Sequence, residues 1–198
     1  MKKLSLVLVT SAVLMATGCT HHYVIDATSC SFKENAPKNN ISVGLILSEE
    51  LKTAGWQKEF MGDHFVMDLG DQFAEVSRCV AKVAFASVLE ASNKPGIQGQ
   101  VDAYLIAKVS KISRTMGATA FGRSDLSVVF EWRFEDKDGK LIWVDTIHAK
   151  GTSATGNIFS HKKEAKKQGQ MMMEDLMNQS HHAISNAVEI KRFVASVK

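Results

Sequence analysis

The fold of this chain is decided by one stretch, Asp125-Leu-Ser-Val-Val-Phe-Glu-Trp-Arg-Phe-Glu135. Apolar side chains occupy every second position, and mainly polar side chains stand between them. Successive side chains of a strand point to opposite faces of a sheet, so this alternation predicts a strand with one buried and one solvated face. The apolar positions are Leu126, Val128, Phe130, Trp132 and Phe134. A sheet of this kind needs helices packed on its buried face.

Further strands are predicted on both sides of this stretch. Asp136-Lys137-Asp138-Gly139 follows it and predicts a hairpin turn, because Asp-Gly readily adopts the positive φ angles that such turns need. Residues 140–155 form the returning strand, and residues 101–114 form the long strand that comes before. Nearer the N-terminus, residues 41–51 contain a strand whose apolar pattern indicates burial on both faces. A shorter strand covers residues 64–68.

Two long helices complete the pattern. The first is expected to begin at Gly70 and to end near Ser92-Asn93-Lys94-Pro95-Gly96, since Pro and Gly terminate helices. The second covers residues 161–188. The order ββαβββα predicts an α+β fold, an antiparallel meander sheet with the two long helices packed on one face. The stripe of the first helix that faces the core comprises Phe73, Val76, Val80, Val83, Ala84 and Val88.

The first 18 residues have the layout of a secretory signal peptide. Lys2 and Lys3 precede the apolar run Leu4–Ala16, and small residues lead to Cys19. The run is shorter than the roughly 20 apolar residues that a membrane span needs. An ordinary secretory peptide followed by an incidental cysteine is the alternative interpretation. On this basis we predict a signal peptide over residues 1–18, a tether over 19–40, and a single α+β domain over 41–198.

The cleavage region resembles the lipobox of bacterial lipoproteins, although Ala16 stands where that family usually has Leu. The resemblance implies that Cys19 is acylated, with chains such as palmitate, and becomes the new N-terminus. Thr20 follows the cysteine in place of Asp, which in that family implies an outer-membrane location facing the periplasm. Acyl chains anchor a protein because each buried CH₂ contributes about 0.8 kcal/mol.

The charge of the chain gives no indication of a nucleic-acid partner. Its net charge is +3, from 24 Lys and Arg against 21 Asp and Glu. Cleavage before Cys19 removes Lys2 and Lys3, so the mature chain is close to neutral. We therefore expect no nucleic-acid binding.

The chain has three cysteines, and Cys19 is assigned to the lipid. Cys30 and Cys79 remain, and an oxidising periplasm favours a disulfide between them. Such a bond closes a loop of about 50 residues and is worth roughly 4 kcal/mol in the loop-entropy model. It would fasten the N-terminal tether to the first helix. Two free buried thiols are the alternative.

No motif predicts catalysis, a metal site or a cofactor. Gly117–Ser124 resembles a phosphate-binding loop, with Arg123 in the Lys position, but a strand rather than a helix is predicted after it. It therefore reads as a flexible hairpin loop, in which Met116 and Phe121 are candidates for contact with a partner or with lipid. The sequence has no H-E-x-x-H or G-x-S-x-G motif. We predict that the chain is not an enzyme.

Two features of the last helix are open to two interpretations. Met171, Met172, Met173 and Met177 either fill the core, which is favoured, or line an adaptable groove for a partner. The run Lys162-Lys163-Glu164-Ala165-Lys166-Lys167 is either a solvated helix face, again favoured, or a patch for anionic lipid.

As a whole, the chain resembles small outer-membrane lipoproteins of the YajG type and other short α+β envelope lipoproteins. The resemblance rests on Cys19, the apolar strand Val43–Leu47, the helix start Gly70-Asp71-Gln72-Phe73 and the apolar tail at Phe193. It implies a non-catalytic, lipid-anchored periplasmic binding or assembly module, whose partners are the membrane and an envelope protein. The alternatives are a pilotin-like escort of a secretion or pilus component, and an envelope hydrolase.

Overall fold

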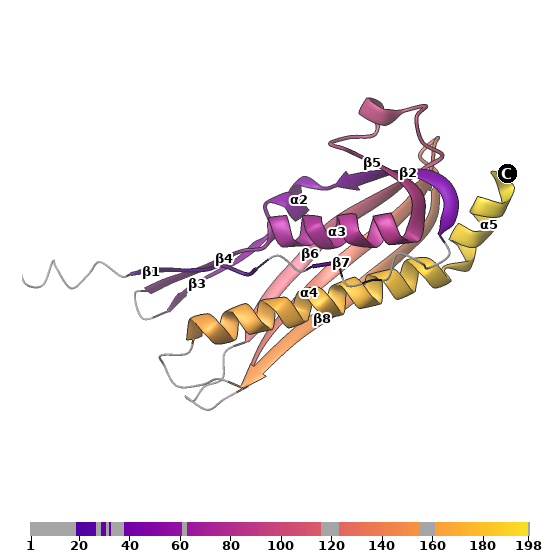
Figure 1. The fold of residues 1–198 in the computed structure, drawn as a ribbon. Helices are drawn as coiled ribbons and strands as arrows, with labels where there is room; N and C mark the ends of the chain where they lie inside the picture. The colour runs from indigo at the N-terminus through magenta and orange to yellow at the C-terminus, as the bar shows by residue number, and fades with distance from the viewer. Residues whose placement is uncertain are drawn as a thin grey trace, which may run out of the picture.

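A computed structural model describes residues 19–26, 29–30, 32, 38–60, 63–115, 123–154 and 161–197. Two sheets and two long helices make up the described chain (Figure 1). The larger sheet has five strands in the order β5-β2-β6-β7-β8. These strands are β2 (Asn39–Leu47), β5 (Phe85–Ala91), β6 (Ala103–Thr115), β7 (Arg123–Asp136) and β8 (Leu141–Ala154).

The smaller sheet has three strands in the order β1-β4-β3. β3 (Gly55–Phe60) and β4 (Asp63–Asp68) pair antiparallel, and β1 (Thr20–Tyr23) lies parallel to β4. The helical segments are α2 (Glu49–Lys52), α3 (Gly70–Ala84), η1 (Pro95–Ile97), α4 (His161–Asn186) and α5 (Val188–Ser196). No helix of the described ranges is both long and apolar enough to cross a membrane.

The alternating stretch forms β7, and its apolar side chains build the core. Leu126, Phe130 and Trp132 are fully buried under α3 and α4, which lie together on this face of the sheet (Figure 1). The indole Nε1 of Trp132 donates a hydrogen bond of 2.8 Å to the hydroxyl of Ser180 on α4. A polar group inside the core therefore has its partner, which avoids the cost of burying it alone.

α4 lies unusually close to the edge strand β8. A Cβ atom on Gly151 would be 1.9 Å from the carbonyl oxygen of Gln168, so only glycine allows this approach. Further along, the carboxylate of Asp175 accepts from the backbone N–H of Lys150 at 2.9 Å, and the amide of Gln179 donates to the carbonyl of His148 at 3.2 Å. Helix side chains thus satisfy backbone groups that the edge strand cannot pair with a neighbour.

The opposite face of the large sheet is mostly solvated, with one small apolar cluster under η1. Ile46, Ile97, Val101 and Tyr104 form this cluster. Beside it, the buried carboxylate of Glu135 pairs with the ammonium of Lys94, and Nη2 of Arg133 lies 3.3 Å from its other oxygen. Two cations therefore compensate the one buried charge on this face.

Several predictions differ from the structure. The order ββαβββα is not found in the described chain, and the strand predicted over residues 41–51 ends at Leu47, because Glu49–Lys52 forms the helix α2. The first helix ends at Ala84 rather than near residue 92, and Phe85–Ala91 is the strand β5. The sheet is mixed rather than an antiparallel meander, because β2 runs parallel to both β5 and β6. Only β6, β7 and β8 form the antiparallel meander that was predicted. Within the predicted tether, Thr20–Tyr23 forms β1, and Tyr23 and Ile25 are buried.

The physical reason for these differences is that strand pairing is non-local. Val88 continues the helical spacing of Val80 and Ala84, so the sequence alone favours a longer helix. Pairing of Phe85–Ala91 with β2 overrides that preference. The apolar residues of β2 on both faces are in turn typical of a central parallel strand.

Candidate functional site

Cys19 lies at the surface, where the chain enters the small sheet. Its backbone nitrogen donates to Oδ1 of Asp63 at 3.0 Å, and its carbonyl accepts from the backbone N–H of His64 at 3.0 Å. The cysteine itself is exposed, and its thiol forms no disulfide. The second of these bonds joins the backbone of Cys19 to β4 at the start of the parallel pairing of β1 and β4. The position of Cys19 relative to the fold is therefore fixed by two hydrogen bonds. We call Cys19, His21, Asp63 and His64 the Cys19 junction.

The carboxylate of Asp63 bridges two parts of this junction. While Oδ1 accepts from the nitrogen of Cys19, Oδ2 lies 3.4 Å from Nε2 of His21. The imidazole of His21 stacks on the ring of Phe65 with centroids 5.0 Å apart. Side chains from β1 and β4 thus contact one another around the backbone of Cys19. Because His21 and Asp63 are both about 40% exposed, at 36% and 42%, the contact between their side chains contributes little stability by itself.

The inner face of the small sheet is attached to the large sheet through Arg114 of β6. Tyr23 and Trp56 lie on either side of Met67 in register, and all three are buried. The guanidinium carbon of Arg114 is 5.2 Å from the ring centroid of Tyr23 and 5.2 Å from that of Trp56. Such cation–π contacts strengthen when water is excluded.

This attachment has an electrostatic cost. Nε and Nη1 of Arg114 are buried without a hydrogen-bond partner in the described structure. Burial lowers the pKa of the Arg114 guanidinium, and the nearby Tyr23 side chain opposes that shift. The two aromatic faces therefore stand in for part of the hydration that the cation loses.

Beyond β1, the N-terminal segment is attached at several separate points. The carbonyl of Ile25 accepts from Nε2 of Gln72 at 2.9 Å, and the Ile25 side chain is buried against Gly169. The carboxylate of Asp26 pairs with the ammonium of Lys166. The segment then reaches Cys30, which forms the predicted disulfide with Cys79 on α3.

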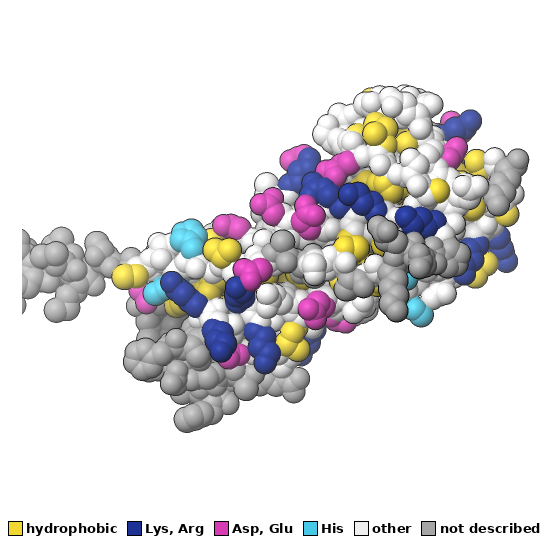
Figure 2. All heavy atoms as spheres, viewed as in Figure 1, with side chains coloured by type: hydrophobic (Ala, Val, Ile, Leu, Met, Phe, Trp, Pro, Cys, Tyr) yellow, Lys and Arg dark blue, Asp and Glu magenta, His cyan; other side chains and the backbone are white. Residues whose placement is uncertain are grey.

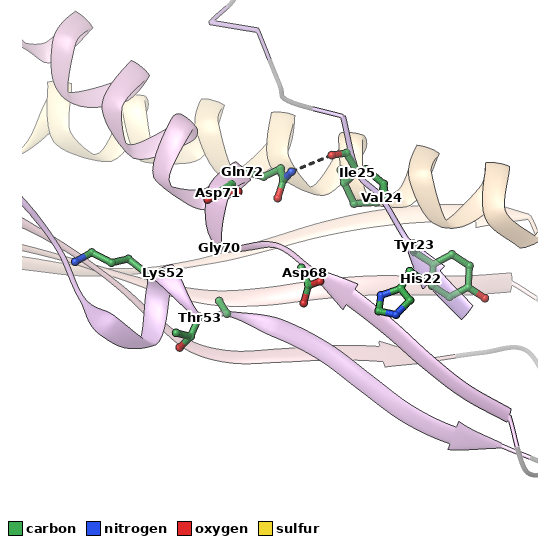
Figure 3. A pocket seen from close by; sticks show the side chains of 11 residues that line it. His22, Tyr23, Val24, Ile25, Lys52, Thr53, Asp68, Gly70, Asp71 and Gln72 are labelled. Carbon is green, nitrogen blue, oxygen red and sulfur yellow. Dashed lines mark hydrogen bonds between the residues drawn. The ribbon is translucent and has the colours of Figure 1, made fainter. Parts of the chain in front are cut away.

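A pocket of about 370 Å³ lies between this segment, the end of α2 and the start of α3 (Figure 3). Its lining carries charges of both signs, from Lys52 and from Asp68 and Asp71. Lys52 extends away from Asp68 in Figure 3, and its ammonium is 2.8 Å from the carboxylate of Glu49. The lining therefore does not gather one set of groups around one point. Among the described residues, no three His, Cys, Asp or Glu side chains are grouped to hold a metal ion.

The other residues predicted to contact a partner lie in different environments. Met172, Met173 and Met177 are buried in the core, where they cannot form a surface for a partner, whereas Met171 is 39% exposed. The sulfur of Met177 lies 3.6 Å from Sγ of Cys79, beside the disulfide. Met116 and Phe121 lie outside the described residues, as does the predicted signal segment 1–18.

Sequence reasoning missed Asp63, His21 and Arg114. The stretch Thr20-His21-His22-Tyr23 is too short and too polar to predict a strand. The alternation of Tyr23 and Ile25 was the only available signal that this segment is packed. Nothing local indicated that Arg114 would lie between two rings from different strands.

Comparison with known proteins supports the fold alone. No family model and no curated protein matches the chain. A protein of Xanthomonas campestris from the family DUF330 has a similar structure, with a TM-score of 0.53 at 9% identity. The match covers 89% of this chain and 99% of that one.

Two bacterial lipoproteins are more distant in structure. A minor lipoprotein of Acinetobacter baumannii gives a TM-score of 0.43 at 13% identity, over 73% of this chain and 90% of that one. A lipoprotein of Neisseria meningitidis gives 0.40 at 13% identity, over 76% and 100%.

Proposed function

We propose that the chain is a lipoprotein anchored through acylated Cys19 in the outer membrane, with its domain in the periplasm. One observation carries the proposal. The only free cysteine in the described chain follows a signal-like segment, is exposed, and is held at the start of β1 by Asp63 and His64. A nitrogen that carries an acyl group still has one N–H, so the bond to Asp63 is compatible with a modified terminus.

The Cys19 junction would let the lipid anchor fix the orientation of the domain relative to the membrane. Because β1 begins at Thr20, the fold starts one residue after the lipid attachment point. A domain on a long tether can tumble above the membrane, whereas this one would be held close to it. The membrane-bound acyl chains would therefore set the orientation of the small sheet as well as its location.

Within that location, we propose a binding or assembly role without catalysis. The threonine that lines the pocket beside β1, Thr53, donates its hydroxyl to the backbone carbonyl of Glu49 at 2.9 Å, whereas an activated nucleophile would donate to a basic side chain. The surfaces available to a partner include Met171 on α4, and Met116 and Phe121 remain candidates from the sequence. The partner would be an envelope protein.

The anchor is tested by producing the full chain in a bacterium and measuring the intact mass. We expect loss of residues 1–18 and the added mass of a diacylglyceryl group, with or without a further acyl chain. Cys19→Ser should abolish the added mass and release the protein from the outer-membrane fraction. Cys30→Ser is the matched control, because it also removes a thiol from the N-terminal segment and should retain the lipid. An unmodified Cys19 in the wild-type protein would refute the proposal.

The partner role is tested with a photo-cross-linking residue placed at Met116, Phe121 or Met171 in growing cells. We expect one envelope protein to be captured from at least one of these positions. Val144 is the matched control, since it is an exposed apolar residue of β8 on the face away from α4. Equal capture at Val144 and at the three test positions, or no capture at all, would argue against a specific partner.

A further inference from the structure

The first turns of α4 carry four lysines on one side of the helix. Ala165, Gln168 and Gly169 are buried against the rest of the protein, so the lysines point outward. Lys166 is paired with Asp26. The other three, Lys162, Lys163 and Lys167, are exposed, and we call them the basic face. Figure 2 shows Lys and Arg side chains gathered over this part of the molecule.

The basic face is not neutralised by its surroundings. None of its three lysines forms an ion pair within the described ranges. Glu164 stands between them in sequence and is half-buried, while Asp26 is already paired with Lys166. The next acidic residue along the helix is Glu174, which lies roughly 10 Å beyond Lys167 at the rise of an α-helix. The net charge of this helix start is therefore positive.

The basic face lies at the same end of the molecule as Cys19. The ion pair between Lys166 and Asp26 places the helix beside the segment that leaves β1, and Gly169 packs on Ile25. An extended chain from Cys19 to Asp26 spans at most roughly 25 Å. Figure 1 shows β1 and the start of α4 at one end of the molecule and α5 at the other.

We propose that the basic face binds the surface of anionic phospholipids next to the acyl anchor. The inference rests on the proposed function, because acylated Cys19 is what brings this end to a membrane. Each lysine near an anionic surface strengthens membrane partition by roughly fivefold. Acyl chains and a basic patch are the two kinds of signal that together give stable membrane attachment.

Met171 adds an apolar contact to the same stripe. Lys163, Lys167 and Met171 are spaced four residues apart, so they follow one another along one side of α4. Met171 is 39% exposed, so part of its thioether is free to reach the membrane–water interface. With the basic face against the lipid, α4 would lie near the membrane and α5 would point into the periplasm.

The first test uses the acylated full-length product in vesicles of phosphatidylcholine, with or without phosphatidylglycerol. Acetylation rates of individual lysines are measured by mass spectrometry. We expect Lys162, Lys163 and Lys167 to react several-fold more slowly when phosphatidylglycerol is present, and high salt to remove the difference. Lys137, Lys140 and Lys191, which are exposed away from the basic face, should react equally in both vesicles.

The second test uses the mature chain, residues 19–198, with Cys19→Ser, so that binding depends on charge alone. Sedimentation with phosphatidylglycerol vesicles should weaken about a hundredfold on changing Lys162, Lys163 and Lys167 to Gln, at low ionic strength. The control changes Lys137, Lys140 and Lys191 to Gln, which alters the net charge equally and should leave binding unchanged. Circular dichroism checks that both variants fold.

These measurements separate the two proposals. If the acylated protein sediments with neutral vesicles but its lysines react equally in both lipids, binding of the basic face to anionic lipid is refuted and the proposed anchor stands. Equal loss of binding in both triple variants also refutes it, because net charge alone would then account for binding. If the wild-type protein carries no lipid and does not sediment with neutral vesicles, the anchor fails, and the inference fails with it.

Discussion

The two sheets of this protein are held in place in different ways. The large sheet packs a continuous apolar face, with Phe130, Trp132 and Phe134 fully buried, against α3 and α4. The small sheet and the N-terminal segment add only a few buried side chains to this core, among them Tyr23, Trp56 and Met67, and are also attached at separate points. These points are the Arg114 stack, the Gln72–Ile25 hydrogen bond, the Asp26–Lys166 ion pair and the Cys30–Cys79 disulfide.

The difference shows how stability and function are divided along the chain. Apolar burial is additive over area and supplies most of the folding free energy. Point contacts contribute less each, but they fix the direction in which a small element lies. The part of the chain that carries Cys19 has a small share of the first kind, through buried Tyr23 and Ile25, and several contacts of the second kind. Its attachment can therefore be altered without unfolding the larger sheet.

The largest effect is expected from breaking the large sheet at Gly151. Gly151→Ala would place a Cβ atom 1.9 Å from the carbonyl oxygen of Gln168, so that α4 must move away from β8. We expect the free energy of unfolding to fall by about 3 kcal/mol or more, measured by urea denaturation. Gly96→Ala is the control, since its nearest atom is Oδ1 of Asn93 at 3.4 Å, on a side chain that can move. Similar losses in both variants would contradict the tight contact.

A smaller effect is expected at Arg114, where the small sheet is attached. Arg114→Lys removes the planar group that faces Tyr23 and Trp56, and we expect a loss of about 1 kcal/mol. Hydrogen exchange should become faster in β3 and β4, while the amides of β7 remain protected. Arg192→Lys, on an exposed side chain of α5, should leave both sheets unchanged. Equally faster exchange in both sheets would show that they do not respond independently.

The smallest effect is expected from the pH response of His181. Its ring lies against that of Phe32 in the N-terminal segment, with the ring centroids 4.3 Å apart and the planes tilted by 31°. Burial, and secondarily the charge of His182, lowers the pKa of His181 below its usual value of 6.5. The unfolded chain then binds the proton first, so the free energy of unfolding falls as the pH drops through this value and is retained above it.

Urea denaturation at a series of pH values measures this response. His181→Gln should reduce the pH dependence, whereas His148→Gln, on an exposed position of β8, should not. An unchanged pH dependence in His181→Gln would remove this residue from the contacts that hold the N-terminal segment.

The same contrast explains which parts of the fold could be predicted. The period-two pattern of β7 and the Asp-Gly turn after it are local signals, and both the meander of β6 to β8 and α4 followed from such patterns. Residues 85–91 keep a helical spacing, and only their pairing with β2 makes them a strand. The apolar residues on both faces of β2 indicated a central strand. No local pattern, however, predicts which strands pair with it.

The candidate site was predictable only where one residue type decides the chemistry. Cys19 could be singled out from the segment before it, and Cys30 with Cys79 from the two thiols that remained. Asp63 and Arg114 are ordinary charged residues in sequence, and they acquire roles from partners 44 residues and more away. Their roles depend on strand register, which a short polar β1 does not reveal.

The disulfide has a consequence for proteolysis. Cys30 and Cys79 are 49 residues apart, and β2, α2, β3 and β4 all lie between them. A protease that cuts the chain once anywhere in this interval therefore leaves two fragments that remain covalently joined. Cys19 stays linked to the rest of the protein after such a cut, because it lies before Cys30 in the sequence. On a non-reducing gel the nicked protein would still migrate as one band. Only a reducing agent would separate the fragment that carries Cys19.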